Sequence, residues 1–106
     1  TTIQSFDPRA LEAVHAIDRQ ISTSLLVDNR DGLQANLDRL SFTPAIYSPA
    51  YKLIDRRQVE TAHALDISVI PWTVNKRQTM LELIAMGVDG FITDYPDLGM
   101  DVLKAI

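Results

Sequence analysis

Proton-transfer chemistry in this sequence is limited to two imidazoles, because His15 and His63 are its only histidines. Histidine changes charge near neutral pH more readily than any other side chain, so it is the first residue type to consider. Both lie in stretches with helical periodicity, at residues 11–17 and 59–65. We therefore expect structural histidines on helix surfaces, and we predict no catalytic residue in the chain.

A second group of residues lies near the ends of short apolar runs or just after them, where ligand-binding side chains of α/β proteins gather. Trp72 and Phe6 offer aromatic surface, and Tyr47 offers a phenolic hydroxyl that could donate a hydrogen bond to a ligand. Asn75 offers an amide, and Asp94 a carboxylate that could support a catalytic histidine. We predict that the first four bind substrate and that Asp94 supports them.

Each of these residues also has a structural interpretation, which the sequence leaves open. Trp72 and Tyr47 fit a packed core, and Asn75 fits the start of a helix. Asp94 fits a cap on the loop that begins at Tyr95-Pro96. A metal site made from Asp28, Asp94 and their neighbours is not favoured, so we predict no metal ligand.

The elements that must position these residues are five β-like runs alternating with helical patterns. The runs start about 20 residues apart, as successive βα units require. Several are apolar on both faces, which is typical of parallel strands covered by helices. They are residues 2–6, 22–27, 45–48, 67–74 and 90–94.

Helix boundaries are marked by capping residues. Asp7, Asp55 and Asn75 each precede a helical pattern and are predicted N-caps. Gly87 is predicted to close the helix over residues 76–86, and a last helix is expected over residues 98–105. The stretch 29–40 fits a helix less well, because Gly32 weakens its start.

Two α/β architectures fit this alternation. One is a complete flavodoxin-like parallel sheet, which the length of 106 residues favours. The other is the last five units of an eight-unit TIM barrel, which normally needs about 250 residues. Periodicity does not separate the two.

Composition excludes several function classes. The net charge of −4, with scattered basic residues, argues against a nucleic-acid surface. No apolar run reaches the ~18–20 residues that span a bilayer. The absence of cysteine excludes disulfides and thiolate metal sites, and the cellular compartment stays open.

Four motifs carry a family resemblance. They are TIQSFDP at residues 2–8, YSP at 47–49, VIPWTVN at 69–75 and GVDGFITDYP at 87–96. In this order and at these separations the chain resembles the C-terminal part of the glycerophosphodiester phosphodiesterase family. The last two motifs, one helix apart, are the most specific.

The resemblance implies a TIM barrel that hydrolyses glycerophosphodiesters to an alcohol and glycerol 3-phosphate. It implies a divalent cation, calcium or magnesium, which would offset phosphate charge. It also implies two catalytic histidines and acidic metal ligands, in a histidine-arginine-glycine motif and on neighbouring strands. None of those motifs occurs here. We therefore expect residues 1–106 to be a C-terminal part that is inactive and binds no cation tightly alone.

The start at Thr1, without a methionine, fits two expectations equally: that further residues precede it, or that processing or removal of a tag produced it. An incomplete barrel exposes strand edges and an apolar interior. The expected partners are therefore the N-terminal half of the barrel or a second copy of the chain. The alternative is a non-catalytic half-barrel that serves binding or self-assembly.

Overall fold

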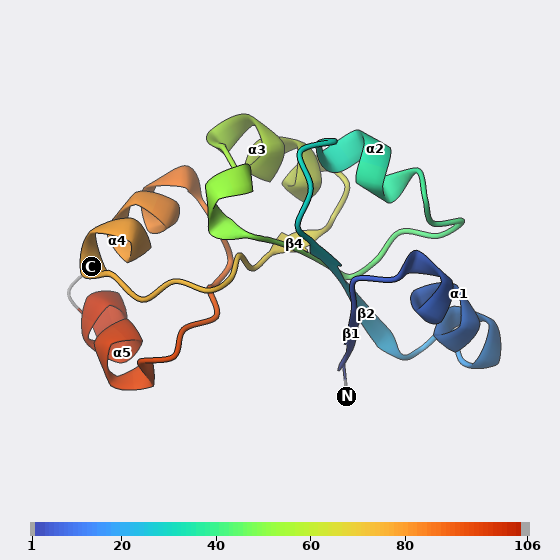
Figure 1. Cartoon of the computed structure of the whole chain (residues 1–106), viewed down its shortest axis with the longest axis horizontal. Helices are drawn as coiled ribbons and strands as arrows, with labels where there is room; N and C mark the ends of the chain where they lie inside the picture. Colours follow the sequence, from blue (N-terminus) through green and yellow to red (C-terminus); the bar gives the residue numbers. More distant parts are fainter. Residues whose placement is uncertain (1, 105–106) are drawn as a thin grey trace.

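The computed structural model describes residues 2–104, which form one parallel sheet with helices between its strands. The strands are β1 (Thr2–Ser5), β2 (Ser22–Val27), β3 (Ile46–Pro49) and β4 (Ser68–Val69). Their order in the sheet is β1-β2-β3-β4, so each strand lies beside the next one in the sequence. The sheet is curved like an arc, and the helices follow one another around its convex side (Figure 1).

Strand order separates the two predicted architectures. A flavodoxin-like sheet places its first strand between the second and the third, whereas a TIM barrel adds each strand beside the previous one. All three strand pairs here are parallel and consecutive. The described residues therefore form part of a TIM barrel, and the flavodoxin-like alternative is wrong.

The fifth predicted strand is not a regular strand, yet its backbone pairs as one. Ile92 N donates to Pro71 O at 2.9 Å, and Val74 N donates to Ile92 O at 2.8 Å. On the other side of β4, Pro49 has no N–H to donate to Ile70 O, which accepts from Ser48 Oγ instead, so the regular ladder with β3 ends after Val69. Residues 89–92 thus extend the arc beyond β4 as a fifth, irregular member.

The helices begin largely where the capping residues predict. They are α1 (Pro8–Ile17), α2 (Leu33–Leu37), α3 (Arg56–Ala64), α4 (Arg77–Met86) and α5 (Pro96–Lys104), with a 3₁₀ turn, η1, at Tyr51–Leu53. Asp7 accepts from Arg9 N at 2.9 Å, and Asp55 accepts from Gln58 N at 2.8 Å. Gly87 ends α4 with a φ of 95°, as predicted.

One predicted cap is wrong, and the predicted bounds of α5 shift. The N-cap of α4 is Lys76, and no side chain bonds this helix end. Asn75 instead bonds the segment that follows α4, because that segment lies beside it in the sheet. α5 begins at Pro96, earlier than predicted, and position 105 of its predicted end lies outside the described residues.

The core lies between the sheet and the helices. Alternate residues of the strands face the helices, and among them Leu25, Val27, Tyr47 and Val69 are buried. The opposite face of the sheet, which would be the interior of a closed barrel, carries half-buried Leu26 and Ile46. Among the described residues, no helix is long and apolar enough to cross a membrane.

Candidate active-site edge

The carboxyl ends of the parallel strands define the edge where a TIM barrel carries its active site. Five segments reach this edge: the residues after β1, β2, β3 and β4, and residues 93–95. Phe6, Trp72, Asn75 and Asp94 all belong to these segments. Four of the five predicted site residues therefore come together at one edge.

Trp72 is held in place by its backbone and by its indole ring. Its indole Nε1 donates to Ser48 O at 2.8 Å, and its backbone N donates to Pro49 O at 3.1 Å. Its ring meets Phe6 edge to face, with ring centroids 5.7 Å apart. Because the indole N–H is already used, Trp72 offers a ring face and not a donor to a ligand. Phe6 is 57% exposed, so the pair forms a partly open aromatic wall.

A cavity of about 280 Å³ opens beside Trp72 at this edge. Its floor and one side are Trp72, Ala50 and the η1 turn, and its other side is the loop after β2. Two cations, Arg30 and Lys52, line it. Sequence reasoning missed both, because isolated basic residues in loops give no signal until the loops are placed side by side.

Asn75, Thr93 and Asp94 form a cluster that joins the two last loops of this edge. Asn75 Oδ1 accepts from Asp94 N at 3.0 Å and from Thr93 Oγ1 at 3.2 Å. Asn75 Nδ2 donates to Asp94 Oδ2 at 3.0 Å. The amide of Asn75 therefore uses both its oxygen and its nitrogen on one neighbouring segment.

Tyr47 lies on the opposite face of the sheet from Trp72. It is 1% exposed, and its hydroxyl accepts from Asn36 Nδ2 on α2 at 3.3 Å. Burial raises the pKa of the Tyr47 hydroxyl above its ordinary value, although the Asn36 hydrogen bond opposes this shift. The structure thus packs Tyr47 against α2, and Tyr47 lines a second cavity of about 200 Å³ and not the cavity beside Trp72.

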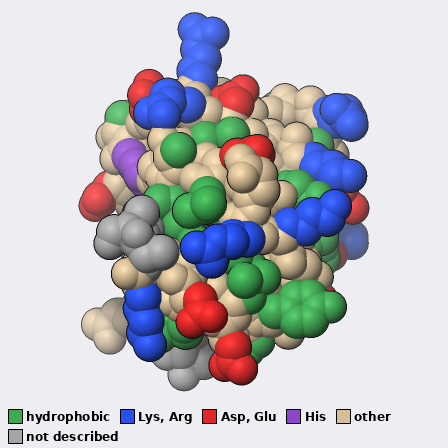
Figure 2. Space-filling view, turned by 90° about the vertical axis from the view of Figure 1, so that its left-hand side faces the viewer, with side chains coloured by type: hydrophobic (Ala, Val, Ile, Leu, Met, Phe, Trp, Pro, Cys, Tyr) green, Lys and Arg blue, Asp and Glu red, His purple; other side chains and the backbone are tan. Residues whose placement is uncertain are grey.

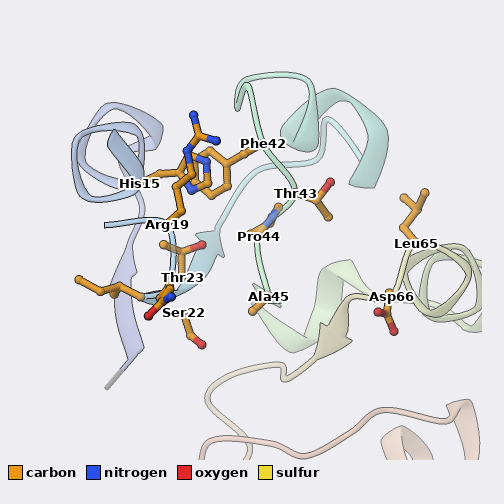
Figure 3. Close-up of a pocket in the computed structure, with 12 residues that line it drawn as sticks. His15, Arg19, Ser22, Thr23, Phe42, Thr43, Pro44, Ala45, Leu65 and Asp66 are labelled. Atoms are coloured by element: carbon orange, nitrogen blue, oxygen red, sulfur yellow. The ribbon is translucent and has the colours of Figure 1, made fainter. Parts of the chain in front are cut away.

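Both histidines lie on helices, as predicted, and away from this edge. His63 on α3 lies 2.8 Å from Asp89 Oδ2, measured from its Nε2. His15 on α1 stacks on Phe42, with ring centroids 3.9 Å apart. The two rings form one side of a cavity of about 420 Å³ at the amino ends of β2 and β3, and Leu65 and Asp66 line the far side (Figure 3).

That larger cavity lies at the end of the sheet where TIM barrels do not carry their chemistry. We therefore place the candidate site at the smaller cavity beside Trp72. Within residues 2–104, no three histidine or acidic side chains are grouped so that they could hold a metal ion. These residues alone do not fit a divalent cation.

Comparison with known proteins agrees with the barrel arc. The sequence pattern of the glycerophosphoryl diester phosphodiesterase family matches residues 1–98. A glycerophosphodiester phosphodiesterase of Bacillus subtilis is 30% identical over 96% of the chain, which spans 36% of that protein.

Solved structures show the same fold. A glycerophosphodiester phosphodiesterase from Parabacteroides distasonis matches 96% of the chain with a TM-score of 0.80 and 27% identity, and the match spans 42% of that structure. An Oleispira antarctica phosphodiesterase solved with sn-glycerol-3-phosphate matches with a TM-score of 0.84 at 24% identity, over 97% of the chain and 41% of that structure. The chain thus spans less than half of each relative's length. It belongs to the glycerophosphoryl diester phosphodiesterase family.

Proposed function

We propose that the protein to which these residues belong hydrolyses glycerophosphodiesters to an alcohol and glycerol 3-phosphate. Residues 1–106 would supply the C-terminal part of its barrel and one wall of its substrate pocket. The observation that carries this proposal is the aromatic pair of Phe6 and Trp72 at the carboxyl edge of a family barrel arc. The named activity of the Bacillus subtilis relative supports the reaction type.

The role of the wall follows from its chemistry. Ring faces pack against the C–H groups of a glycerol backbone and exclude water from one side of the phosphodiester. Trp72 suits this role, because its backbone and its indole N–H are both tied to β3. A wall whose side chain is already fixed orients the substrate with little loss of side-chain conformational entropy on binding.

The acid–base groups and the cation would belong to residues outside these 106. The family generally depends on a divalent cation, and the described residues do not provide a ligand set for one. Both histidines lie away from the carboxyl edge, in contacts with Phe42 and Asp89. We therefore propose that the remaining barrel units, docked on the open edges of this arc, are its partner.

The test compares the native protein, whose intact mass shows how many residues accompany these, with the 106-residue chain. We expect the native protein to release glycerol 3-phosphate from glycerophosphodiesters and to lose this activity when a chelator removes divalent cations. The 106-residue chain should release none. A native protein that hydrolyses no glycerophosphodiester in the presence of calcium or magnesium would contradict the proposed function.

A second candidate is a non-catalytic half-barrel that binds or assembles. It is favoured by one observation, that neither histidine lies at the carboxyl edge. An intact mass equal to 106 residues, without hydrolytic activity, would support this candidate. Activity in the 106-residue chain would eliminate it.

A further inference from the structure

We propose that Arg30 and Lys52 form a subsite for a negatively charged group on the alcohol portion of the substrate. This inference rests on the proposed function and narrows its substrate class. The subsite would favour glycerophosphodiesters whose alcohol portion carries a phosphate group of its own. The argument comes from the shape, charge and position of the groove beside Trp72.

The two cations stand where two cavities meet. The cavity of about 280 Å³ contains Trp72, and a neighbouring cavity of about 200 Å³ reaches Gln58 on α3. Arg30 and Lys52 line both of them. The two cavities share four lining residues, Asn29, Arg30, Lys52 and Leu53, from which we infer one groove that leads from the aromatic wall at the edge toward the helix layer. A substrate whose glycerol end lies on Trp72 can extend its other end along this groove.

Among the described residues, neither cation has an acidic partner. In residues 2–104, the side chains of Arg30 and Lys52 take part in no ion pair and no hydrogen bond. Arg9 and Arg39, by contrast, each pair with an aspartate. Lys52 Nζ lies 5.9 Å from the centroid of the Tyr51 ring, so a cation–π contact keeps the ammonium group near the groove.

The charge balance of the groove differs from that of the chain. The chain carries a net charge of −4, with 14 acidic and 10 basic residues. The cavity beside Trp72 has two cations and one acid, Asp28. The neighbouring cavity of about 200 Å³ has two cations and no acid. The groove is therefore a positive region on an acidic molecule, and it attracts an anionic group while it repels a cationic one.

The test uses the native protein and two substrates that differ in one group. Glycerophosphoglycerol has a neutral alcohol, and the same compound with a phosphate on its terminal hydroxyl has an anionic one. For Lys52→Ala, we expect kcat/KM to fall about tenfold with the phosphorylated substrate, because a charge-assisted hydrogen bond is lost. With glycerophosphoglycerol, kcat/KM should fall by less, because its alcohol offers Lys52 no anionic group. Arg30→Ala should act in the same direction, and added salt should shrink the difference between substrates.

Arg57→Ala is the matched control, since Arg57 is an exposed cation on α3 that lines neither cavity. It should leave both substrates unaffected. An equal loss with both substrates in the Lys52 and Arg30 variants would overturn the subsite, because the cations would then act on the scissile phosphate or on the fold. No loss with either substrate would overturn it too.

A binding measurement separates this inference from the proposed function. If the wild-type protein hydrolyses neither substrate, the proposed function fails, and calorimetric titration with the phosphorylated compound still tests the subsite. We expect Lys52→Ala to weaken that binding about tenfold. Equal affinity of wild type and variant would overturn the subsite whether or not the protein is a hydrolase.

Discussion

Asn75 shows how a single amide can connect two loops of the active-site edge. It binds the backbone N of Asp94, the hydroxyl of Thr93 and the carboxylate of Asp94. An amide suits this place because it donates and accepts at once, whereas a carboxylate only accepts. The loop that carries Trp72 and the segment 93–95 are thereby held at a constant separation, which a fixed aromatic wall requires.

Exchanging the amide of Asn75 and the carboxylate of Asp94 should show how much this contact contributes to the free energy of unfolding. Asn75→Asp removes the donor and sets two carboxylates about 3 Å apart, so we expect a loss of about 1 kcal/mol in the free energy of unfolding. Asp94→Asn keeps an acceptor for Asn75 and should cost less. The double variant Asn75→Asp/Asp94→Asn restores one donor and one acceptor, so it should recover most of the stability. Urea unfolding of the 106-residue chain measures all three.

The contrary outcome is a double variant that is no more stable than Asn75→Asp alone. Asp97→Asn provides the control, because Asp97 is exposed in the first turn of α5 and belongs to no part of this cluster. It should change the unfolding midpoint little.

At the scale of elements, the sequence predicts best where one local signal determines the result. The apolar runs at 2–6, 22–27 and 45–48 predict β1, β2 and β3 to within about a residue at most ends. The capping residues Asp7 and Asp55 predict two helix starts, because a cap is a contact within one turn. These signals depend only on neighbours in the chain.

The rest depends on contacts between distant segments, which no local pattern contains. Asn75 has the sequence signature of a helix cap, but its side chain bonds the segment 93–94 instead of the start of α4. Tyr47 ends a run as a site residue would, but the alternation of β3 turns it to the helices. Trp72 and Phe6 were predicted as separate aromatic groups, and only the arc brings their rings together.

The close packing of α5 on the irregular fifth segment depends on Gly99. A Cβ built at Gly99 would lie 3.3 Å from the Phe91 ring and 3.5 Å from Thr93 Cγ2. Gly99→Val should therefore overpack this contact and lower the free energy of unfolding by about 1–3 kcal/mol. Gly90→Val is the matched control, since a Cβ at Gly90 meets nothing within 4 Å.

Urea unfolding of both variants at the same protein concentration measures the difference. A Gly99→Val chain as stable as Gly90→Val would show that α5 can move away from Phe91 without cost.

At the scale of the whole molecule, the arc has two surfaces. On the face formed by α4 and α5, hydrophobic side chains lie among charged ones (Figure 2). The concave side of the sheet mixes half-buried Leu26, Ile46 and Ile70 and exposed Phe6 with polar residues, which by the strand register are Gln4, Ser24, Ser48 and Ser68. One strand edge is open beside β1, and another lies beside the segment 89–92.

Two open strand edges, with half-buried Leu26, Ile46 and Ile70 on the face between them, favour association with another chain. We therefore expect the 106-residue chain to sediment as a dimer or larger species whose average mass rises with concentration. Substituting Ile46→Lys places a charge on the concave face and should shift the chain toward monomer. Leu103→Lys, an exposed site on α5, is the control and should leave the association unchanged.

In the native protein the remaining barrel units would cover this face, so the sedimentation of the native protein should not depend on concentration. A 106-residue chain that sediments as a compact monomer at every concentration would contradict the idea that this face needs a partner.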